Sequence, residues 1–136
     1  MKLATWNVNS LNVRLPQVLD WLAANQPDGL CLQETKLTDD KFPHADIAAA
    51  GYQAQWFGQK TYNGVALLTK SAATDVLKNI PGFDDEQARV IAGTVDGVRV
   101  IGAYFPNGEA PDSAKFQYKM KWLEALRDWV RAELAS

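Results

Sequence analysis

The stretch DGLCLQETKL, residues 28–37, decides the fold because it joins a buried strand to a group of polar side chains. The apolar run Gly29–Leu32 is typical of a strand that is covered on both faces. The run ends abruptly in four polar residues, 33–36. In α/β proteins, ligands bind at the carboxyl ends of strands. Glu34 is therefore the first candidate functional residue.

The segments before and after this strand alternate between strand and helix patterns. Residues 2–8 predict a first strand, and residues 13–24 predict a helix because their leucines and Val18 fall on one helical face. Pro16 fits the first turn of that helix, where a missing N–H is tolerated. Five further strands and two further helices are expected, at residues 52–58, 64–70, 74–80, 89–95 and 98–105 and at residues 42–51 and 113–135.

This order of elements predicts an α/β fold in which helices cover one face of a mixed sheet. The pair Asp96-Gly97 favours a tight hairpin between the last two strands. In the C-terminal helix, Ser113 or Asp112 is the expected N-cap. The apolar face expected for that helix consists of Phe116, Met120, Leu123, Val130 and Leu134.

The composition indicates one globular domain of 136 residues, 47% hydrophobic and 22% charged. Neither a membrane-spanning run nor a signal peptide is apparent in the sequence. Cys31 is the only cysteine; we expect it to be a buried structural thiol in a cytoplasmic protein. The formal net charge of −2 is not that of a bulk nucleic-acid binder. A polyanionic substrate would need a metal ion or local basic residues to offset this charge.

Asn7 ends the first strand as Glu34 ends the second. If a helix connects these strands as parallel neighbours, they lie about 4.8 Å apart and the two side chains meet. A carboxylate and an amide oxygen form a partial site for Mg²⁺, which takes one or two carboxylates together with water and phosphate. The alternative is that Glu34 forms an ordinary salt bridge.

Four motifs occur in order along the chain: TWNVNSL at 5–11, LQETKL at 32–37, GQKTYNGVALLTK at 58–70 and AYFPNGE at 103–109. Together they resemble the exodeoxyribonuclease III type of abasic-site endonuclease. The resemblance implies half of a two-sheet α/β sandwich and a Mg²⁺-dependent phosphodiesterase, with Mn²⁺ as a substitute metal. It also implies a substrate, namely double-stranded DNA with abasic sites or 3′ ends, and a role in base excision repair.

The same resemblance assigns roles to individual residues. It makes Glu34 the principal metal ligand and Asn7 a second member of the metal and catalytic site. It makes Tyr104 a catalytic residue that contacts the scissile phosphate. It also implies three residues that contact DNA, namely Lys60, Arg89 and Asn107.

Members of this family continue beyond the segment that residues 1–136 match, and the continuation carries an Asp-x-Asn motif and a catalytic His. We therefore expect the chain to be the N-terminal part of such a domain and to be inactive alone. We also expect an apolar sheet face left bare by the absent half to drive homodimer formation. Two alternatives stay open: a related phosphoesterase acting on a lipid or inositol phosphate, and a non-catalytic fragment.

Overall fold

The computed structural model describes residues 1–135, which form two compact units. The first unit comprises residues 1–78 and 87–104 and contains every strand that the structure describes. The second unit comprises residues 79–86 and the chain from Phe105 onward, including the long C-terminal helix.

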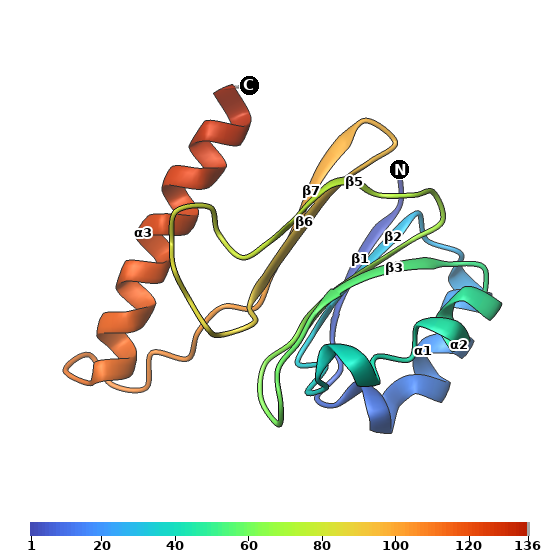
Figure 1. Ribbon diagram of the computed structural model, residues 1–136, viewed down its shortest axis with the longest axis horizontal. Coiled ribbons are helices and arrows are strands. Elements are labelled where there is room, and N and C mark those ends of the chain that lie inside the picture. The colour runs from blue at the N-terminus through green and yellow to red at the C-terminus, as the bar shows by residue number, and fades with distance from the viewer. Residues whose placement is uncertain (136) are drawn as a thin grey trace. The chain divides into compact units, whose positions relative to one another are not determined.

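Two sheets make up most of the first unit (Figure 1). In the four-stranded sheet, β1 and β2 are parallel and the other pairs are antiparallel, so this sheet is mixed as predicted. The other sheet is an antiparallel meander. The four-stranded sheet has the order β1 (Leu3–Asn7), β2 (Gly29–Gln33), β4 (Val65–Thr69) and β3 (Gln53–Phe57). The three-stranded sheet has the order β5 (Thr74–Lys78), β6 (Val90–Val95) and β7 (Val98–Ala103).

The strands of the four-stranded sheet send alternate side chains into two different cores. Leu30 and Leu32 of β2 pack on the helix side, together with Val18 of helix α1 (Leu11–Asn25) and Ile47 of helix α2 (His44–Ala49). Cys31, between the two leucines, packs on the opposite side against strands of the second sheet. The prediction that this strand is covered on both faces is confirmed.

The expectation of a bare sheet face is wrong for the four-stranded sheet. Val65 and Leu67 of β4 pack against Ile91 of β6 and Val100 of β7, so the same chain supplies the covering layer. The expected homodimer rested on an apolar face that, in the part of the chain described, is already buried. The error arose because all the predicted strands were assigned to one sheet.

Helix α1 begins earlier than predicted, at Leu11. The reason is tertiary, because the N–H of Ser10 donates to the carbonyl of Glu34 and that of Leu11 to Thr35, at 2.8 and 3.0 Å. These bonds satisfy donors that the first turn of a helix leaves free. Pro16 therefore lies inside the helix and not in its first turn, which corrects the prediction.

The second unit is built around helix α3 (Ala114–Ala135). Its N-cap is Ser113 as predicted, since the hydroxyl accepts from the N–H of Phe116 at 3.1 Å. The predicted apolar face is wrong at Met120 and Leu134, which are 41% and 81% exposed. The residues that this helix buries are Trp122 and Trp129, which the sequence predicted to be packing residues of a helix face.

Trp122 makes an edge contact with the ring of Phe105, with 4.9 Å between ring centroids. Large aromatic rings bury more area than aliphatic side chains and so determine which face is covered. Within residues 1–135, no helix is both long and apolar enough to cross a lipid bilayer.

Two loops that face each other at one end of the four-stranded sheet are held at close range by Gly64. This residue has a φ of 96°, and a Cβ at this position would overlap the hydroxyl oxygen of Thr35. The N–H of Thr35 donates to the carbonyl of Gly64 at 3.2 Å. Only glycine fits both the backbone conformation and this close approach.

We therefore predict that Gly64→Ala destabilises the protein more than Gly51→Ala does. Gly51 has a similar φ of 89° but no atom within 4 Å of an added Cβ, so it is the matched control. The left-handed conformation alone should cost about 1–2 kcal/mol in both variants. Overpacking should add about 1–3 kcal/mol for Gly64→Ala. Urea unfolding monitored by circular dichroism measures both, and equal losses would contradict the packing argument.

Candidate active site

The ends of β1 and β2 bring Asn7 and Glu34 to the same edge of the sheet. The two strands are parallel, and Asn7 lies opposite Gln33 in the register, so Glu34 is the next residue along. Gln33 also reaches across to β1, where its amide donates to the hydroxyl of Thr5 at 2.8 Å. The β-α-β connection that was expected to join these two ends is therefore present.

Glu34 does not continue the strand, because its φ of 58° lies in the left-handed region. Such a conformation is unfavourable for a residue with a side chain and persists only where the surroundings impose it. Three backbone hydrogen bonds do so here, from Ser10 to the Glu34 carbonyl, from Thr35 to Gly64, and from Lys36 to Asn63, at 2.8, 3.2 and 2.9 Å.

Tyr104 directly follows β7 of the second sheet, and its hydroxyl donates to Oε1 of Glu34. Tyr104 also packs at the edge of the core between the two sheets. The left-handed turn at Glu34 thus directs the carboxylate to the side of the sheet on which Tyr104 lies. Two residues that are 70 positions apart in the sequence meet in this way.

Arg89 lies over the ring of Tyr104, with its guanidinium carbon 5.0 Å from the ring centroid. Its Nη1 donates to the carbonyl of Tyr104 at 3.3 Å, and the N–H of Tyr104 donates to the carbonyl of Arg89 at 2.7 Å. The Nε of Arg89 donates to the side chain of Gln87 at 2.8 Å. Arg89 therefore holds both the backbone and the ring of Tyr104.

The pKa of the Tyr104 hydroxyl is raised above its ordinary value of 10.0. Burial is the main cause, and the hydrogen bond to Glu34 and the negative charge of Glu34 add to it. The positive charge of Arg89 acts in the opposite direction and lowers the pKa. Tyr104 is thus a protonated donor at neutral pH.

Asn7 is oriented by its own loop. Its Oδ1 accepts from the N–H of Asn9 at 3.1 Å, and the side chain of Asn9 in turn accepts from the ammonium of Lys36 at 2.7 Å. Lys36 therefore contacts the Asn7 loop. Sequence analysis missed Asn9 and Lys36 as parts of the site, although both lie inside the motifs that it singled out.

Gln59 precedes Lys60 in the segment that the family resemblance predicts to contact DNA. Its Oε1 accepts from the N–H of Ala88 at 2.6 Å and from the amide of Asn63 at 3.0 Å. The side chain thus connects the loop before β4 to the residue that precedes Arg89. Gln59 is a positioning residue in this geometry.

The six residues predicted for the site are divided between the two units. Asn7, Glu34, Tyr104 and Arg89 lie in the first unit and are connected as described above. Lys60 is exposed in the same unit and lines a cavity beside the Glu34 loop. Asn107 belongs to the second unit, where its side chain accepts from the N–H of Glu109 at 3.0 Å.

The oxygen atoms at the strand ends suit a hard cation. Glu34 supplies one carboxylate and Asn7 one amide oxygen, and the described part of the chain has no cluster of three or more His, Cys, Asp or Glu that could hold a metal. This donor set fits Mg²⁺, which keeps several waters and binds through one or two carboxylates together with phosphate oxygens. It does not fit Zn²⁺, which prefers four nitrogen or sulfur ligands.

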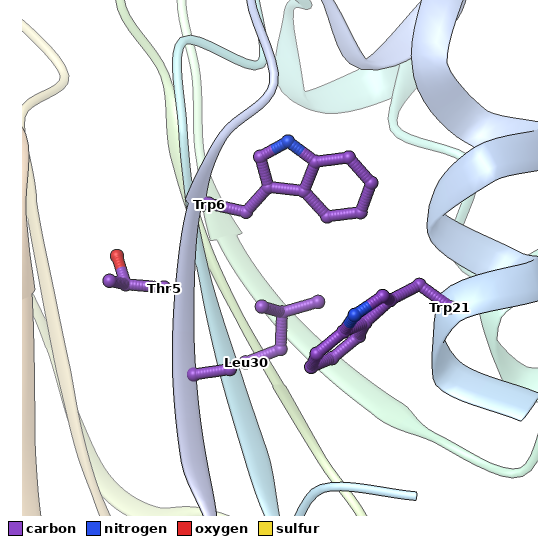
Figure 2. Close-up of a pocket in the computed structure, with 5 residues that line it drawn as sticks. Thr5, Trp6, Trp21 and Leu30 are labelled. Atoms are coloured by element: carbon purple, nitrogen blue, oxygen red, sulfur yellow. The ribbon is translucent and has the colours of Figure 1, made fainter. Parts of the chain in front are cut away.

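An apolar cavity of about 250 Å³ lies elsewhere, between β1 and α1 (Figure 2). The rings of Trp6 and Trp21 meet in it edge to face, with 6.4 Å between their centroids. Figure 2 shows Thr5 pointing to the other side of β1 from Trp6. Because Thr5 bonds Gln33 on that other side, the cavity and the Glu34 site lie on opposite faces of the sheet.

Solved structures similar to this chain come from nucleic-acid enzymes. A Neisseria 3′ phosphatase bound to a product DNA hairpin matches with a TM-score of 0.97 and 57% identity, over 99% of this chain and 53% of that one. An AP endonuclease from Archaeoglobus fulgidus matches with a TM-score of 0.93 and 41% identity, over 97% of this chain and 51% of that one. The α/β half-sandwich that was predicted is the fold shared with them.

Comparison of sequences also finds nucleases as relatives of this chain. Exodeoxyribonuclease III of Haemophilus influenzae is 34% identical over 139 residues, which are 98% of this chain and 52% of that protein. The chain spans about half the length of the curated relatives it matches. The profile of the endonuclease/exonuclease/phosphatase family matches residues 4–136. Since this match covers nearly the whole sequence, the chain belongs to the endonuclease/exonuclease/phosphatase family.

Proposed function

We propose that the chain carries the metal-binding and phosphate-contacting half of a Mg²⁺-dependent DNA phosphodiesterase of the exodeoxyribonuclease III type. The proposed substrates are abasic sites and 3′ ends in double-stranded DNA, and the proposed compartment is the cytoplasm. The observation that carries the proposal is the hydrogen bond from the Tyr104 hydroxyl to Glu34. It connects the end of β7 in the second sheet with the end of β2, where the metal site is predicted.

In the proposed mechanism Glu34 and Asn7 would hold the metal ion through their oxygens. The Mg²⁺ ion would supply Lewis-acid chemistry at a phosphodiester oxygen. Tyr104 keeps its proton and donates a hydrogen bond, first to Glu34 and then to a phosphate oxygen that enters beside it. A donor aimed at the place where negative charge develops stabilises the transition state.

Arg89 has three roles in this proposal. Its contacts with the ring and carbonyl of Tyr104 fix the direction of the hydroxyl. Its positive charge lowers the pKa of Tyr104 and so makes the hydroxyl a stronger hydrogen-bond donor than it would be beside Glu34 alone. It also places a cation beside the anionic substrate.

The names of the relatives support a DNA substrate. The Haemophilus protein is an exodeoxyribonuclease, and the Neisseria protein is a 3′ phosphatase whose structure holds a DNA hairpin. These words describe those proteins, and their transfer to this chain is part of the proposal. No feature of residues 1–135 specifically favours a lipid or inositol phosphate.

We further propose that the 136 residues alone turn over slowly. The described residues include no cluster of three or more His, Cys, Asp or Glu that could hold a metal. The proposal assigns the Glu34 carboxylate to the metal and names no second group to activate water. A general base typically contributes a factor of about 10²–10⁴ to the rate.

The first prediction concerns the protonation of Tyr104. Subtracting the ultraviolet tyrosinate titration of Tyr104→Phe from that of the wild type should isolate a transition above pH 10.0. Arg89→Gln should move this transition to higher pH, because it removes the charge that favours ionisation. Glu34→Gln should move it to lower pH. Arg99→Gln is the matched control, since Arg99 also donates to a backbone carbonyl, that of Asp75 at 2.7 Å, and lies at the opposite end of β7 from Tyr104. An unshifted transition in both site variants would contradict the described electrostatics.

The second prediction concerns the metal. Mn²⁺, used as a paramagnetic substitute, should bind weakly and broaden the NMR signals of backbone amides near Asn7 and Glu34. Glu34→Gln should abolish this broadening, and Asp20→Asn, which removes an exposed carboxylate from α1, should leave it unchanged. Broadening centred on other acidic residues would refute the proposed metal site.

The third prediction concerns catalysis and substrate. On a duplex with one abasic site in Mg²⁺, the purified chain should cleave at least about 10²-fold more slowly than an intact exodeoxyribonuclease III used as the reference. It should nevertheless bind that duplex in preference to inositol phosphates, and Glu34→Gln should remove the metal-dependent part of the binding. Rapid turnover lost in Glu34→Ala would overturn the expected inactivity. Preferential binding of inositol phosphate would overturn the DNA assignment.

A further inference from the structure

We propose that a cavity in the second unit is a docking site for an extended segment of a partner protein, which inserts an arginine side chain. The cavity has a volume of about 410 Å³ and lies between the loop after β5 and the C-terminal half of α3. Both of these segments belong to the second unit. The lining consists of residues 81–83 and of Ala125, Asp128, Trp129 and Ala132. The proposed nuclease activity assigns no role to these residues.

The lining of the cavity combines two aromatic rings with one carboxylate. Phe83 lies on the loop and Trp129 on the helix, while Asp128 is the only charged residue among the described residues that line the cavity. The remaining lining residues are proline, glycine and alanine, which leave room for a ligand. A guanidinium group can stack on an aromatic ring and donate to a carboxylate at the same time. The lining is therefore complementary in charge and in shape to an arginine side chain.

Asp128 remains accessible to a ligand although it has a partner in the chain. Its Oδ1 accepts from Nε of Arg127 at 3.0 Å, and the two side chains are 66% and 54% exposed. An ion pair with this exposure contributes little free energy and does not enclose the carboxylate. Adjacent residues on a helix point in different directions, and Arg127 does not line the cavity. Because a carboxylate accepts several hydrogen bonds, Asp128 can bind Arg127 and a ligand together.

The ring of Trp129 is held in place beside a second carboxylate. Its indole N–H donates to Oε1 of Glu133 at 3.1 Å, one helical turn further along α3. The polar atom of the indole is thereby satisfied, so the ring can line the cavity with its apolar surface. Trp129 is only 7% exposed, and the residues around it therefore fix its position. A ligand cation would meet a rigid ring together with the negative charges of Asp128 and Glu133.

The loop that forms the opposite wall is organised before any ligand binds. The N–H of Phe83 donates to the carbonyl of Ile80 at 3.1 Å. Asp85 accepts at its carbonyl from the amide of Asn79, at 2.7 Å, and at its carboxylate from the hydroxyl of Tyr118 on α3. The rings of Phe83 and Tyr118 are also in contact, with 6.5 Å between their centroids. A site organised in advance loses little conformational entropy on binding.

The length of the cavity suits a short piece of extended chain. Ala125 and Ala132 lie seven positions apart on α3, which corresponds to about 10 Å along a helix. An extended chain advances about 3.3 Å per residue, so about three residues span this distance. Asp128 and Trp129 lie midway between the two alanines, at the place of the middle residue of such a segment. Residues 81 and 82 on the other side are exposed, so the cavity is open to a chain that enters from solvent.

The test is an NMR titration of the chain with the peptide acetyl-Gly-Leu-Arg-Leu-Gly-amide. The two leucines supply apolar contacts on either side of the arginine. The chain has five tryptophans, and each indole N–H gives its own signal. The signal of Trp129 should shift and reach saturation as the peptide is added. The signal of Trp56, whose indole donates to the carbonyl of Asp39 in the first unit, should not move.

Asp128→Asn should weaken peptide binding roughly tenfold, because it removes a charge-assisted hydrogen bond. A peptide with citrulline in place of arginine has nearly the same shape without the charge, and it should bind the wild type with a similarly raised Kd. The citrulline peptide should also bind the wild type and Asp128→Asn about equally, which a merely structural effect of the substitution would not produce. Glu124→Gln, at an exposed position of α3 outside the lining, is the matched control and should change the Kd much less. Circular dichroism checks that both variants are folded.

The proposal is overturned if the Trp129 signal does not respond, or if the arginine and citrulline peptides bind equally well. Arginine amide that binds as tightly as the peptide would show a site for a small cation and overturn the docking of a segment. A Trp129 signal that moves with protein concentration in the absence of peptide would show that a second copy of the chain covers the cavity, and it would also overturn the proposal. Tighter binding of the peptide than of arginine amide, with a signal independent of protein concentration, supports an extended partner segment.

Discussion

Two backbone hydrogen bonds, from Thr35 to Gly64 and from Lys36 to Asn63, determine the shape of the whole site. They fasten the segment after β2 to the segment before β4 and, together with the bond from Ser10 to the Glu34 carbonyl, impose the left-handed turn at Glu34. That turn directs the carboxylate to Tyr104. On the outer side, the same fastening brings the Lys36 and Lys60 loops around one cavity. A single pair of peptide contacts thus organises both the loop of the proposed metal site and the cavity beside it.

Much of this fold could be predicted from local patterns. The apolar run before Glu34 indicated a strand covered on both faces, and Leu30, Cys31 and Leu32 do alternate between two cores. Asp96 and Gly97 both have positive φ, which is the backbone that a tight hairpin requires. These features depend on neighbouring residues, so the sequence contains the information directly.

What could not be predicted depends on distant partners. Nothing in the sequence around Glu34 indicates a left-handed conformation, because residues 63 and 64 impose it. The division of the strands into two sheets was missed for the same reason, and so was the covering of β4 by β6 and β7. In α3 the predicted packing of Trp122 and Trp129 is confirmed, but Met120 and Leu134, also predicted for the apolar face, are exposed. The roles expected for Glu34, Asn7 and Tyr104 remain proposals.

The contact between Tyr104 and Glu34 joins strands that belong to different sheets. Neither strand can present the pair by itself, and the turn at Glu34 relaxes when residues 63 and 64 move away. A chain that is still emerging from the ribosome, or one that is being degraded, therefore has no assembled site. The proposed site therefore exists only in a chain whose two sheets have both assembled.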